Sequence, residues 1–361
     1  MLITGGAGFI GCHVCDALLA RGYRVRVLDR MLEQVHSNRP PNPILRETEL
    51  LVGDVRDAAL VGKALRGVDA VIHLAAEVGV GQSMYEIERY VGGNDQGTAV
   101  LLQALIAQPV RRVVVASSMS IYGEGLYRTA EGGLVDDAVR GTTAWDPVDA
   151  QGRKLVPVAT PESKRASLAS VYAITKFVQE RLVLNVAPAY DMQAVALRLF
   201  NVFGPGQALS NPYTGVLAIF AAALLNGRAP AVFEDGEQRR DFVHVEDVAR
   251  AFVLALEHPA APGGVFNIGS GESVSIREVG EMIADAMGRG DLPPTILGKA
   301  RTGDIRHCFA DITQARQVLG FEPRRFLRSS LGELANWVRR QQAIDRAAEA
   351  QRELETRGLV A

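Results

Sequence analysis

Two short stretches of this chain carry residue types whose spacing could perform chemistry. Residues 5–11 read Gly-Gly-Ala-Gly-Phe-Ile-Gly, and Tyr172 and Lys176 stand four positions apart. A glycine-rich loop lets the backbone approach a pyrophosphate, and side chains four residues apart lie on one face of a helix. An ammonium group and a positive nicotinamide ring near a tyrosine favour its phenolate, which can act as a general base. Together the two stretches predict hydride transfer at a carbon that bears a hydroxyl.

The sequence around the glycine loop fits a dinucleotide site. Residues 2–4 are apolar and apolar residues recur at helical spacing after Gly11, so the loop joins a strand to a helix. Amide N–H groups and the positive end of that helix can bind phosphate. Asp29 follows a second predicted strand and can accept hydrogen bonds from a ribose 2′-hydroxyl while repelling a 2′-phosphate. This favours NAD over NADP, although Arg30 could weaken the preference, and a glycine turn without a ligand is the alternative.

Composition excludes several other classes of protein. The chain has 361 residues, 48% hydrophobic and 22% charged, which is enough for one large or two unequal domains. A net charge of −2 offers no basic field for nucleic acid, and no apolar run reaches the ~18 residues of a membrane span. Three cysteines are too few for a disulfide framework, so we expect a cytoplasmic protein without a signal peptide. Cys12 and Cys15 have the spacing of a metal-binding pair but no second pair, so we interpret them as packing residues and expect no metal.

Apolar runs and helical periodicity alternate through the first half of the chain. The predicted strands are 2–4, 23–28, 49–52, 70–74, 111–116 and 193–198, and the predicted helices are 11–21, 57–66, 95–107 and 171–187. This order predicts an α/β fold with a doubly wound parallel sheet of the Rossmann type. Ligands of such sheets bind beyond the carboxyl ends of the strands, so residues that follow several strands should meet in one crevice. These residues are Asp29, Asp54, Val55, Ala75, Ala76, Ser117 and Ser118.

The alternation becomes irregular and rich in Pro and Gly after Arg198. We therefore expect two interleaved domains followed by a C-terminal helix. The dinucleotide-binding domain covers 1–198 and about 236–260, the smaller substrate domain covers about 199–235 and 261–328, and a charged surface helix covers 329–361. The stretch at about 123–170 predicts an insertion in the first domain, and long irregular segments of this kind are lids or disordered. We favour a lid.

Ten motifs, in order, resemble those of the extended short-chain dehydrogenase/reductase superfamily, specifically its NAD-dependent nucleotide-sugar epimerases and dehydratases. They are TGGAGFIG at 4–11, GDVRD at 53–57, HLAA at 73–76, NDQGT at 94–98, SSMSIYG at 117–123, YAITK at 172–176, RLFNVFGPGQ at 198–207, RRDFVHVEDVARA at 239–251, FNIGSG at 266–271 and GDIRHCFAD at 303–311. The resemblance covers nearly the whole chain. It implies a Rossmann domain that holds NAD and a smaller C-terminal domain that closes over a sugar nucleotide.

The resemblance also implies cofactor contacts. Asp54 and Val55 would lie along the adenine, and Asn94 and Ser117 would lie near the dinucleotide. The full set of expected cofactor residues is Gly5, Gly8, Phe9, Ile10, Gly11, Asp29, Arg30, Asp54, Val55, Leu74, Ala75, Ala76, Asn94, Ser117, Tyr172 and Lys176. Asp95 departs from the family pattern, in which an apolar residue is common at that position.

The expected catalytic residues are Tyr172, Lys176 and Ser118. Tyr172 would take the hydroxyl proton while hydride leaves the same carbon, and Ser118 would hydrogen-bond the same oxygen. In 4,6-dehydratase relatives acidic residues follow the matching Ser or Thr, whereas this chain has Met119 and Ser120 there. The site is therefore equipped to oxidise C4 and return the hydride to the other face, which is 4-epimerisation with NAD bound throughout. A reductase or dehydrogenase with net redox turnover and a non-catalytic dinucleotide sensor are the alternatives.

The resemblance assigns the later motifs to a nucleotide-diphosphate sugar. Asn201 would contact the diphosphate, Arg240 and Arg301 would neutralise the phosphates, and residues 231–233 would lie along the nucleobase. Guanidinium groups suit this role because their forked donors match phosphate oxygens. A surface ion pair with Asp241 or Asp247 is the alternative for Arg240, and we expect His244 to be structural. The expected substrate-binding residues are Ser118, Met119, Ser120, Asn201, Phe233, Arg240, Arg301 and Asp304.

The length of the insertion at about 123–170 favours one branch of the family. There are 49 residues between Tyr122 and Tyr172, which is more than in the common hexose epimerases. Together with VGVGQSMYEIERY, ASSMSIYGEGLYR and GPGQALSNPYTGV, this looks most like the dTDP-L-rhamnose 4-epimerase branch, which makes dTDP-6-deoxy-L-talose. A UDP-hexose or another deoxysugar nucleotide stays open as the substrate. By analogy with the family, the helices at 95–107 and 171–187 imply a homodimer.

Overall fold

A seven-stranded parallel sheet forms the centre of the computed structural model, which describes residues 1–36, 42–136, 138–140, 145–213, 215–343 and 345–360. Its strand order is β14-β9-β5-β4-β1-β2-β3. The strands are β1 (Leu2–Thr4), β2 (Arg26–Asp29), β3 (Glu49–Val52), β4 (Ala70–His73), β5 (Arg112–Ser118), β9 (Gln193–Leu199) and β14 (Val265–Ile268). This confirms the α/β fold with a doubly wound parallel sheet, and each of the six predicted strands overlaps a strand of this sheet.

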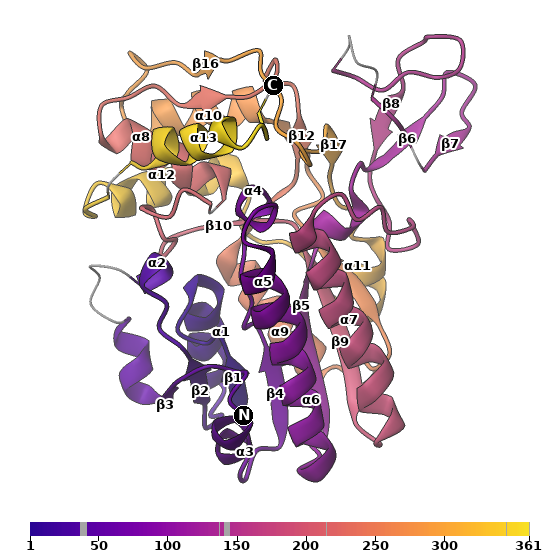
Figure 1. The fold of residues 1–361 in the computed structure, drawn as a ribbon, viewed down its shortest axis with the longest axis vertical. Helices are drawn as coiled ribbons and strands as arrows, with labels where there is room; N and C mark the ends of the chain where they lie inside the picture. Colours follow the sequence, from indigo (N-terminus) through magenta and orange to yellow (C-terminus); the bar gives the residue numbers. More distant parts are fainter. Residues whose placement is uncertain (37–41, 137, 141–144, 214, 344, 361) are drawn as a thin grey trace.

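Helices cover both faces of the sheet because successive residues of each buried strand point to opposite sides. Ile3 and Val114 pack against α1 (Phe9–Leu19) and α9 (Val245–Glu257), whereas Leu2 and Val113 pack on the other face. The helices of that other face are α3 (Ala58–Ala64), α6 (Gly97–Ala107) and α7 (Val171–Ala189). Figure 1 shows α6 and α7 side by side in front of the strands.

A second unit lies beyond the carboxyl ends of the strands, above the sheet in Figure 1. Its core contains Phe220, Ile283 and Leu331, which come from α8 (Val216–Leu225), α10 (Ile276–Ala286) and α12 (Leu327–Val338). Short strands surround these helices, namely β10 (Asn201–Phe203), β11 (Ala231–Val232), β12 (Arg239–Arg240), β13 (Phe242–His244), β15 (Val274–Ser275), β16 (Thr295–Ile296) and β17 (His307–Cys308). The smaller elements of the first unit are α2 (Glu33–His36), η1 (Pro43–Glu47), α4 (Val80–Ser83), α5 (Ile87–Tyr90), the π-helix η2 (Val91–Gln96) and η3 (Met119–Tyr122).

The structure differs from the expected domain boundaries at two places. Strand β14 lies within the range 261–328 expected for the substrate domain, yet it pairs with β9 as the edge of the central sheet, and α11 (Thr313–Leu319) packs beside it. The range 329–361 holds most of α12 and all of α13 (Ala347–Thr356) instead of one surface helix. Helix α12 is amphipathic, and its apolar side completes the core of the second unit, so it is not a surface addition.

The insertion at 123–170 forms a small antiparallel sheet. Strands β6 (Leu126–Arg128), β7 (Leu134–Val135) and β8 (Val156–Val158) pair in the order β7-β6-β8, at the upper right of Figure 1. The described part of this segment is thus folded, while residues 137 and 141–144, which the same expectation covered, lie outside the described residues. Of the helices in the described ranges, none combines the length and the hydropathy that a membrane span requires.

Candidate active site

A cavity of about 780 Å³ lies between the carboxyl ends of the central strands and the second unit. It brings together residues from the glycine loop, the ends of β2, β4 and β5, the start of α7 and the second unit. The sequence-predicted residues that line it are Gly5, Gly8, Phe9, Ile10, Gly11, Asp29, Arg30, Asp54, Val55, Leu74, Ala75, Ala76, Ser117, Ser118, Met119, Ser120, Tyr172, Lys176, Asn201, Phe233, Arg240, Arg301 and Asp304. Of the predicted set, Asn94 is the one residue that does not line the cavity.

The glycine loop is packed too tightly for side chains. Gly5 has φ +70°, and a Cβ atom on it would lie 2.7 Å from the backbone nitrogen of Ala75. A Cβ atom on Gly11 would lie 2.5 Å from the carbonyl oxygen of Gly5. Gly8 is the N-cap of α1 and lines the cavity together with Phe9 and Ile10, so the N-terminus of this helix faces the cavity. This arrangement fits the pyrophosphate of a dinucleotide.

Asp29 is a preorganised hydrogen-bond acceptor at the end of β2. Its Oδ2 accepts a hydrogen bond from the Ala7 N–H at 3.0 Å, and its Oδ1 accepts one from the Met31 N–H at 2.9 Å. Burial opposes ionisation, but the nearby His36 ring, whose Nε2 lies 3.6 Å from Oδ1, and these backbone bonds outweigh it and hold the pKa of Asp29 below its usual value. The carboxylate is therefore charged at neutral pH and suited to bind ribose hydroxyls.

Arg30 is engaged by carboxylates at the cavity wall. Its guanidinium pairs with Glu77 and lies 3.6 Å from Asp54, and Glu77 also pairs with Arg89 at 2.8 Å. Glu77 is buried, so its charge depends on these two arginines. Sequence reasoning assigned no role to Glu77 or Arg89. The one available signal was the position of Glu77 directly after the HLAA motif.

The side chains of Asn94 and Ser117 hydrogen-bond to neighbouring protein groups. The Oδ1 of Asn94 accepts from the Glu77 N–H at 2.6 Å, and its Nδ2 donates to the Thr175 Oγ1 at 2.9 Å. The hydroxyl of Ser117 donates to the buried Glu180 at 2.5 Å. Both side chains thus brace the loops and helix α7 that shape the cavity, because their polar atoms are taken up by the protein itself.

Tyr172 lies in the first turn of α7. Its backbone N–H donates to the Ser83 Oγ at 3.0 Å, and its ring packs edge-on against Tyr90 with centroids 6.4 Å apart. Burial raises the pKa of Tyr172, and a hydrogen bond with Ser118 opposes this rise. Ser118 ends β5, and its Oγ accepts from the N–H and the hydroxyl of Ser120 at 3.2 and 3.0 Å.

Lys176 is buried one turn further along α7. Its Nζ donates to the Gln179 Oε1 at 2.7 Å, and burial lowers its pKa to about 7, although Glu180 and Asp95 favour the charged form. The expectation that Lys176 and a nicotinamide ring together favour the Tyr172 phenolate stays a prediction. In the protein alone, burial is the largest influence on the pKa of Tyr172, and Ser118 opposes it.

A buried polar chain that sequence reasoning missed continues below Lys176. The Nε2 of Gln179 donates to the Thr98 Oγ1 at 2.8 Å and lies 3.2 Å from the His73 Nε2. His73 is also hydrogen-bonded to the Thr4 hydroxyl at 2.7 Å, and burial lowers its pKa to about 3, so the ring is neutral. These side chains fix the position of Gln179 and, through it, of the lysine.

The expected substrate residues line the part of the cavity nearest the second unit. The Arg301 guanidinium lies 4.5 Å from the centre of the Phe233 ring and 2.8 Å from Asp304. Arg240 donates to the carbonyl oxygens of Ile305 at 2.5 Å and Arg306 at 2.9 Å. The Oδ1 of Asn201 is buried and has no hydrogen-bond partner among the described residues, which marks it as an acceptor available to a ligand.

The sequence left structural roles open for Arg240, His244, Cys12 and Cys15. Asp241 accepts from Ser270 and Asp247 pairs with Arg250, so the ion pair suggested for Arg240 is not formed. His244 caps α9 by accepting from the Glu246 N–H, in agreement with a structural role. Burial raises the pKa of the Cys12 and Cys15 thiols to about 12, as packing residues require. In the described ranges no cluster of three His, Cys, Asp or Glu side chains could hold a metal ion.

The C-terminal segment also lines the cavity, which sequence reasoning missed by assigning it to the surface. Leu354 and Gln351 of α13 and Leu359 face the cavity. The Arg357 guanidinium lies 4.4 Å from the centre of the Tyr85 ring of the first unit, and the Thr302 N–H donates to the Leu359 carbonyl at 2.9 Å. The segment therefore joins the two units across one side of the cavity.

Comparisons with known proteins agree on one family. The model described as "NAD dependent epimerase/dehydratase family" matches residues 1–269. A dTDP-L-rhamnose 4-epimerase from Burkholderia thailandensis is 36% identical over 353 residues, covering 96% of each chain. A UDP-glucose 4-epimerase from Thermotoga maritima, solved with UDP-glucose, has a TM-score of 0.76 at 29% identity and covers 94% of this chain and 98% of its own. A dTDP-glucose 4,6-dehydratase from Streptomyces venezuelae, solved with NAD, has a TM-score of 0.77 at 27% identity, covering 94% and 97%.

Proposed function

The chain belongs to the NAD-dependent epimerase/dehydratase family, and on this premise we propose that it inverts C4 of dTDP-L-rhamnose to give dTDP-6-deoxy-L-talose. It is an NAD-dependent carbohydrate epimerase. The observation that carries the proposal is that Tyr172, Lys176 and Ser118 line one cavity in which neither of the two residues after Ser118 is acidic. The identity of the sugar nucleotide is tested by the experiment described below.

Each catalytic group has a defined task in this proposal. The glycine loop and Asp29 would hold NAD, which would supply reversible hydride transfer at C4. The phenolate oxygen of Tyr172 takes the proton of the C4 hydroxyl, and the resulting phenol gives it back after inversion. Ser118 favours the deprotonated form of the phenol, and Lys176, with a pKa near 7, supplies a positive charge next to the site when it is protonated.

The turn after Ser118 separates epimerisation from elimination. Loss of a hydroxyl from the 4-keto sugar needs an acid to protonate the leaving group. Met119 and Ser120 occupy the two positions after Ser118, and the Ser120 hydroxyl donates a hydrogen bond to the Ser118 Oγ. The 4-keto sugar therefore has one productive outcome in this site, which is the return of hydride to either face.

The choice of dTDP-L-rhamnose is supported by the identity of 36% to the Burkholderia enzyme over 96% of both chains. A UDP-hexose is the second candidate, because the Thermotoga UDP-glucose 4-epimerase has the same fold over nearly its whole length. The nucleobase and diphosphate would occupy the side of the cavity that holds Phe233, Arg301, Arg240 and Asn201.

The direct test is proton NMR of the purified protein with a panel of dTDP- and UDP-sugars and no added NAD. Conversion of dTDP-L-rhamnose to its C4 epimer is the expected result. Faster conversion of UDP-glucose would favour the second candidate. Turnover that requires stoichiometric NAD(P)H or NAD(P)⁺ would instead indicate a net reductase or dehydrogenase.

We also propose a homodimer formed through α6 and α7. Ile106 and Ile174 on these helices are exposed, as are Ile87 and Val91 on the neighbouring α5 and η2. Apolar side chains gathered on adjacent helices favour a protein partner over water. Light scattering after size-exclusion chromatography should give the mass of a dimer, and a monomer mass at micromolar concentration would contradict the proposal.

A further inference from the structure

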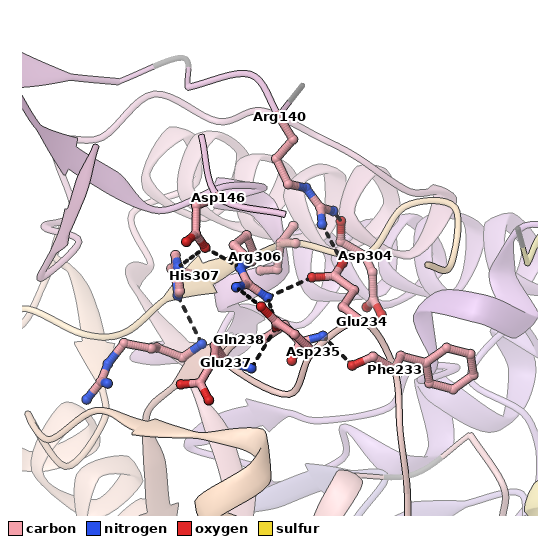
Figure 2. A network of polar contacts seen from close by, with 12 residues as sticks. Arg140, Asp146, Phe233, Glu234, Asp235, Glu237, Gln238, Asp304, Arg306 and His307 are labelled. Atoms are coloured by element: carbon pink, nitrogen blue, oxygen red, sulfur yellow. Dashed lines mark hydrogen bonds and ion pairs between the residues drawn. The ribbon is translucent and has the colours of Figure 1, made fainter. Parts of the chain in front are cut away.

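The insertion reaches the nucleotide side of the cavity through two charged residues. Figure 2 shows Arg140 and Asp146 pointing from the insertion toward the second unit. Arg140 pairs with Glu234 and donates to the carbonyl oxygen of Asp304, and Asp146 accepts from the Arg306 Nε at 2.7 Å. Glu234 directly follows Phe233, and Asp304 belongs to the same turn as Arg301. The insertion thus contacts both segments that carry the proposed nucleotide residues.

Several charged side chains surround Arg140, whose Nε also lies 3.3 Å from the Glu124 carboxylate. Glu234 and Arg306 are each 1% exposed, and the Arg306 Nη1 lies 3.0 Å from Glu234. Arg306 is shared, because it also pairs with Asp235 at 2.6 Å and with Asp146. A buried carboxylate without adequate compensation is strongly destabilising. Arg140 supplies the second positive charge that Glu234 needs.

Glu234 also holds a backbone conformation that few residues adopt. Its φ of +54° lies in the left-handed region, which disfavours side chains other than glycine. Its N–H donates to the Lys299 carbonyl at 2.8 Å and its carbonyl accepts from the Gly298 N–H at 3.1 Å. This turn sets the direction in which Phe233 leaves β11 and meets the Arg301 guanidinium. The surrounding contacts must therefore maintain the strained residue.

We propose that Arg140 is a positioning residue for the nucleotide half of the site. By pairing with Glu234 and holding the carbonyl of Asp304, it fixes Phe233 and Arg301 in the arrangement that receives a nucleoside diphosphate. Arg140 does not line the cavity, so it acts through these residues. The inference rests on the proposed function for the identity of the ligand, since a nucleotide sugar is assumed to occupy this side.

The test uses binding of free TDP and UDP to the purified protein, measured by titration calorimetry. Arg140→Ala should weaken TDP or UDP binding about tenfold while kcat at saturating substrate changes by less than about threefold. Arg140→Lys keeps the charge but not the forked contact, so its TDP affinity should lie between those of the unmodified protein and Arg140→Ala. Should the alanine variant fail to fold, the lysine variant still gives the comparison. Arg153→Ala is the matched control, because Arg153 lies in the same insertion and pairs there with Glu131 and Asp149.

A second substitution distinguishes positioning from general loss of structure. Adding Glu234→Gln to Arg140→Ala removes the uncompensated charge and should restore most of the lost TDP affinity. The proposal is overturned by unchanged TDP binding in Arg140→Ala, by an equal loss in Arg153→Ala, or by no recovery in the double variant. If the unmodified protein binds neither TDP nor UDP, the proposed substrate class fails and this inference fails with it. Weakened TDP binding in a protein that inverts no sugar would retain the inference and reject the 4-epimerase assignment.

Discussion

Tyr172, in the first turn of α7, and Ser118, the last residue of β5, line the same cavity, and Ser118 opposes the rise that burial causes in the pKa of Tyr172. The two residues are 54 positions apart in the sequence, and the pairing of β4, β5 and β9 brings them together. Because the parallel strands end at one edge, Tyr172, the proposed general base, and Ser118 meet where a ligand of the sheet would bind.

Replacing Tyr172 by Phe should lower kcat by about 10² to 10⁴ because it removes the general base and little else. Bound NAD should remain, since the phenyl ring still packs against Tyr90. The measurement is the initial rate of epimerisation together with the dinucleotide released on denaturation. Tyr90→Phe is the matched control, because it removes a neighbouring phenol that bonds to Gln82 and should change kcat little. Equal losses in the two variants would assign the effect to packing.

Replacing Ser118 by Ala should move the pH profile of kcat/KM. Ser118 opposes the rise that burial causes in the pKa of Tyr172, so its removal raises that pKa. The limb of the profile that reports deprotonation of the base should therefore shift to higher pH, with a lower rate at neutral pH. An unshifted limb with a uniformly reduced rate would mean that Ser118 acts only by orienting the substrate.

Asp95→Val should stabilise the protein and slow the reaction. Burial raises the pKa of Asp95 from 3.8 to about 6, and its Oδ1 has no hydrogen-bond partner among the described residues. Because the pKa of Asp95 is higher in the folded state than in the unfolded state, ionisation of Asp95 destabilises the folded protein. This destabilisation is absent below about pH 4 and complete above about pH 6. With a discount for partial exposure, the gain in unfolding free energy near pH 8 should be about 1 kcal/mol, and it should shrink near pH 5.

The rate should fall in the same variant because Asp95 favours the charged form of Lys176. Removing the carboxylate lowers the pKa of Lys176 further, so less of it is protonated at neutral pH. Thermal unfolding at two pH values and kcat at neutral pH check both effects. Asp95→Asn is the control that keeps the side-chain shape, and a gain in stability independent of pH would attribute the effect to packing instead of charge.

Most of the fold and of the cavity lining could be predicted from the sequence because the relevant signals are local. Alternating apolar runs predict the parallel sheet, and parallel strands carry Asp29, Ala75 and Ser118 to one edge. The hydrogen-bond directions of Asn94 and Ser117 could not be predicted, because they depend on Glu77 and Glu180 from other elements. A motif indicates that a polar residue matters but does not indicate which neighbour it binds.

The roles of β14 and α13 could not be predicted from the sequence, because they also depend on contacts with other elements. β14 reads as part of the irregular second half until its pairing with β9 is seen, and α13 reads as a charged surface helix. The lowered pKa of Lys176 could not be predicted either, because spacing along α7 shows proximity to Tyr172 but not the loss of water around both groups. Burial from several elements determines these properties.

Leu354→Ala should raise the KM for the nucleotide sugar while leaving kcat nearly unchanged. Leu354 is 6% exposed, faces the cavity and packs near Gly81 of α4, so it holds α13 against the first unit. Removing its methyl groups leaves a void and weakens this contact, and we expect a rise in KM of about threefold to tenfold. Arg352→Ala is the matched control, since Arg352 lies on the exposed side of the same helix. Steady-state kinetics with both variants decide the question, and an unchanged KM in Leu354→Ala would show that α13 covers the cavity without contributing to substrate binding.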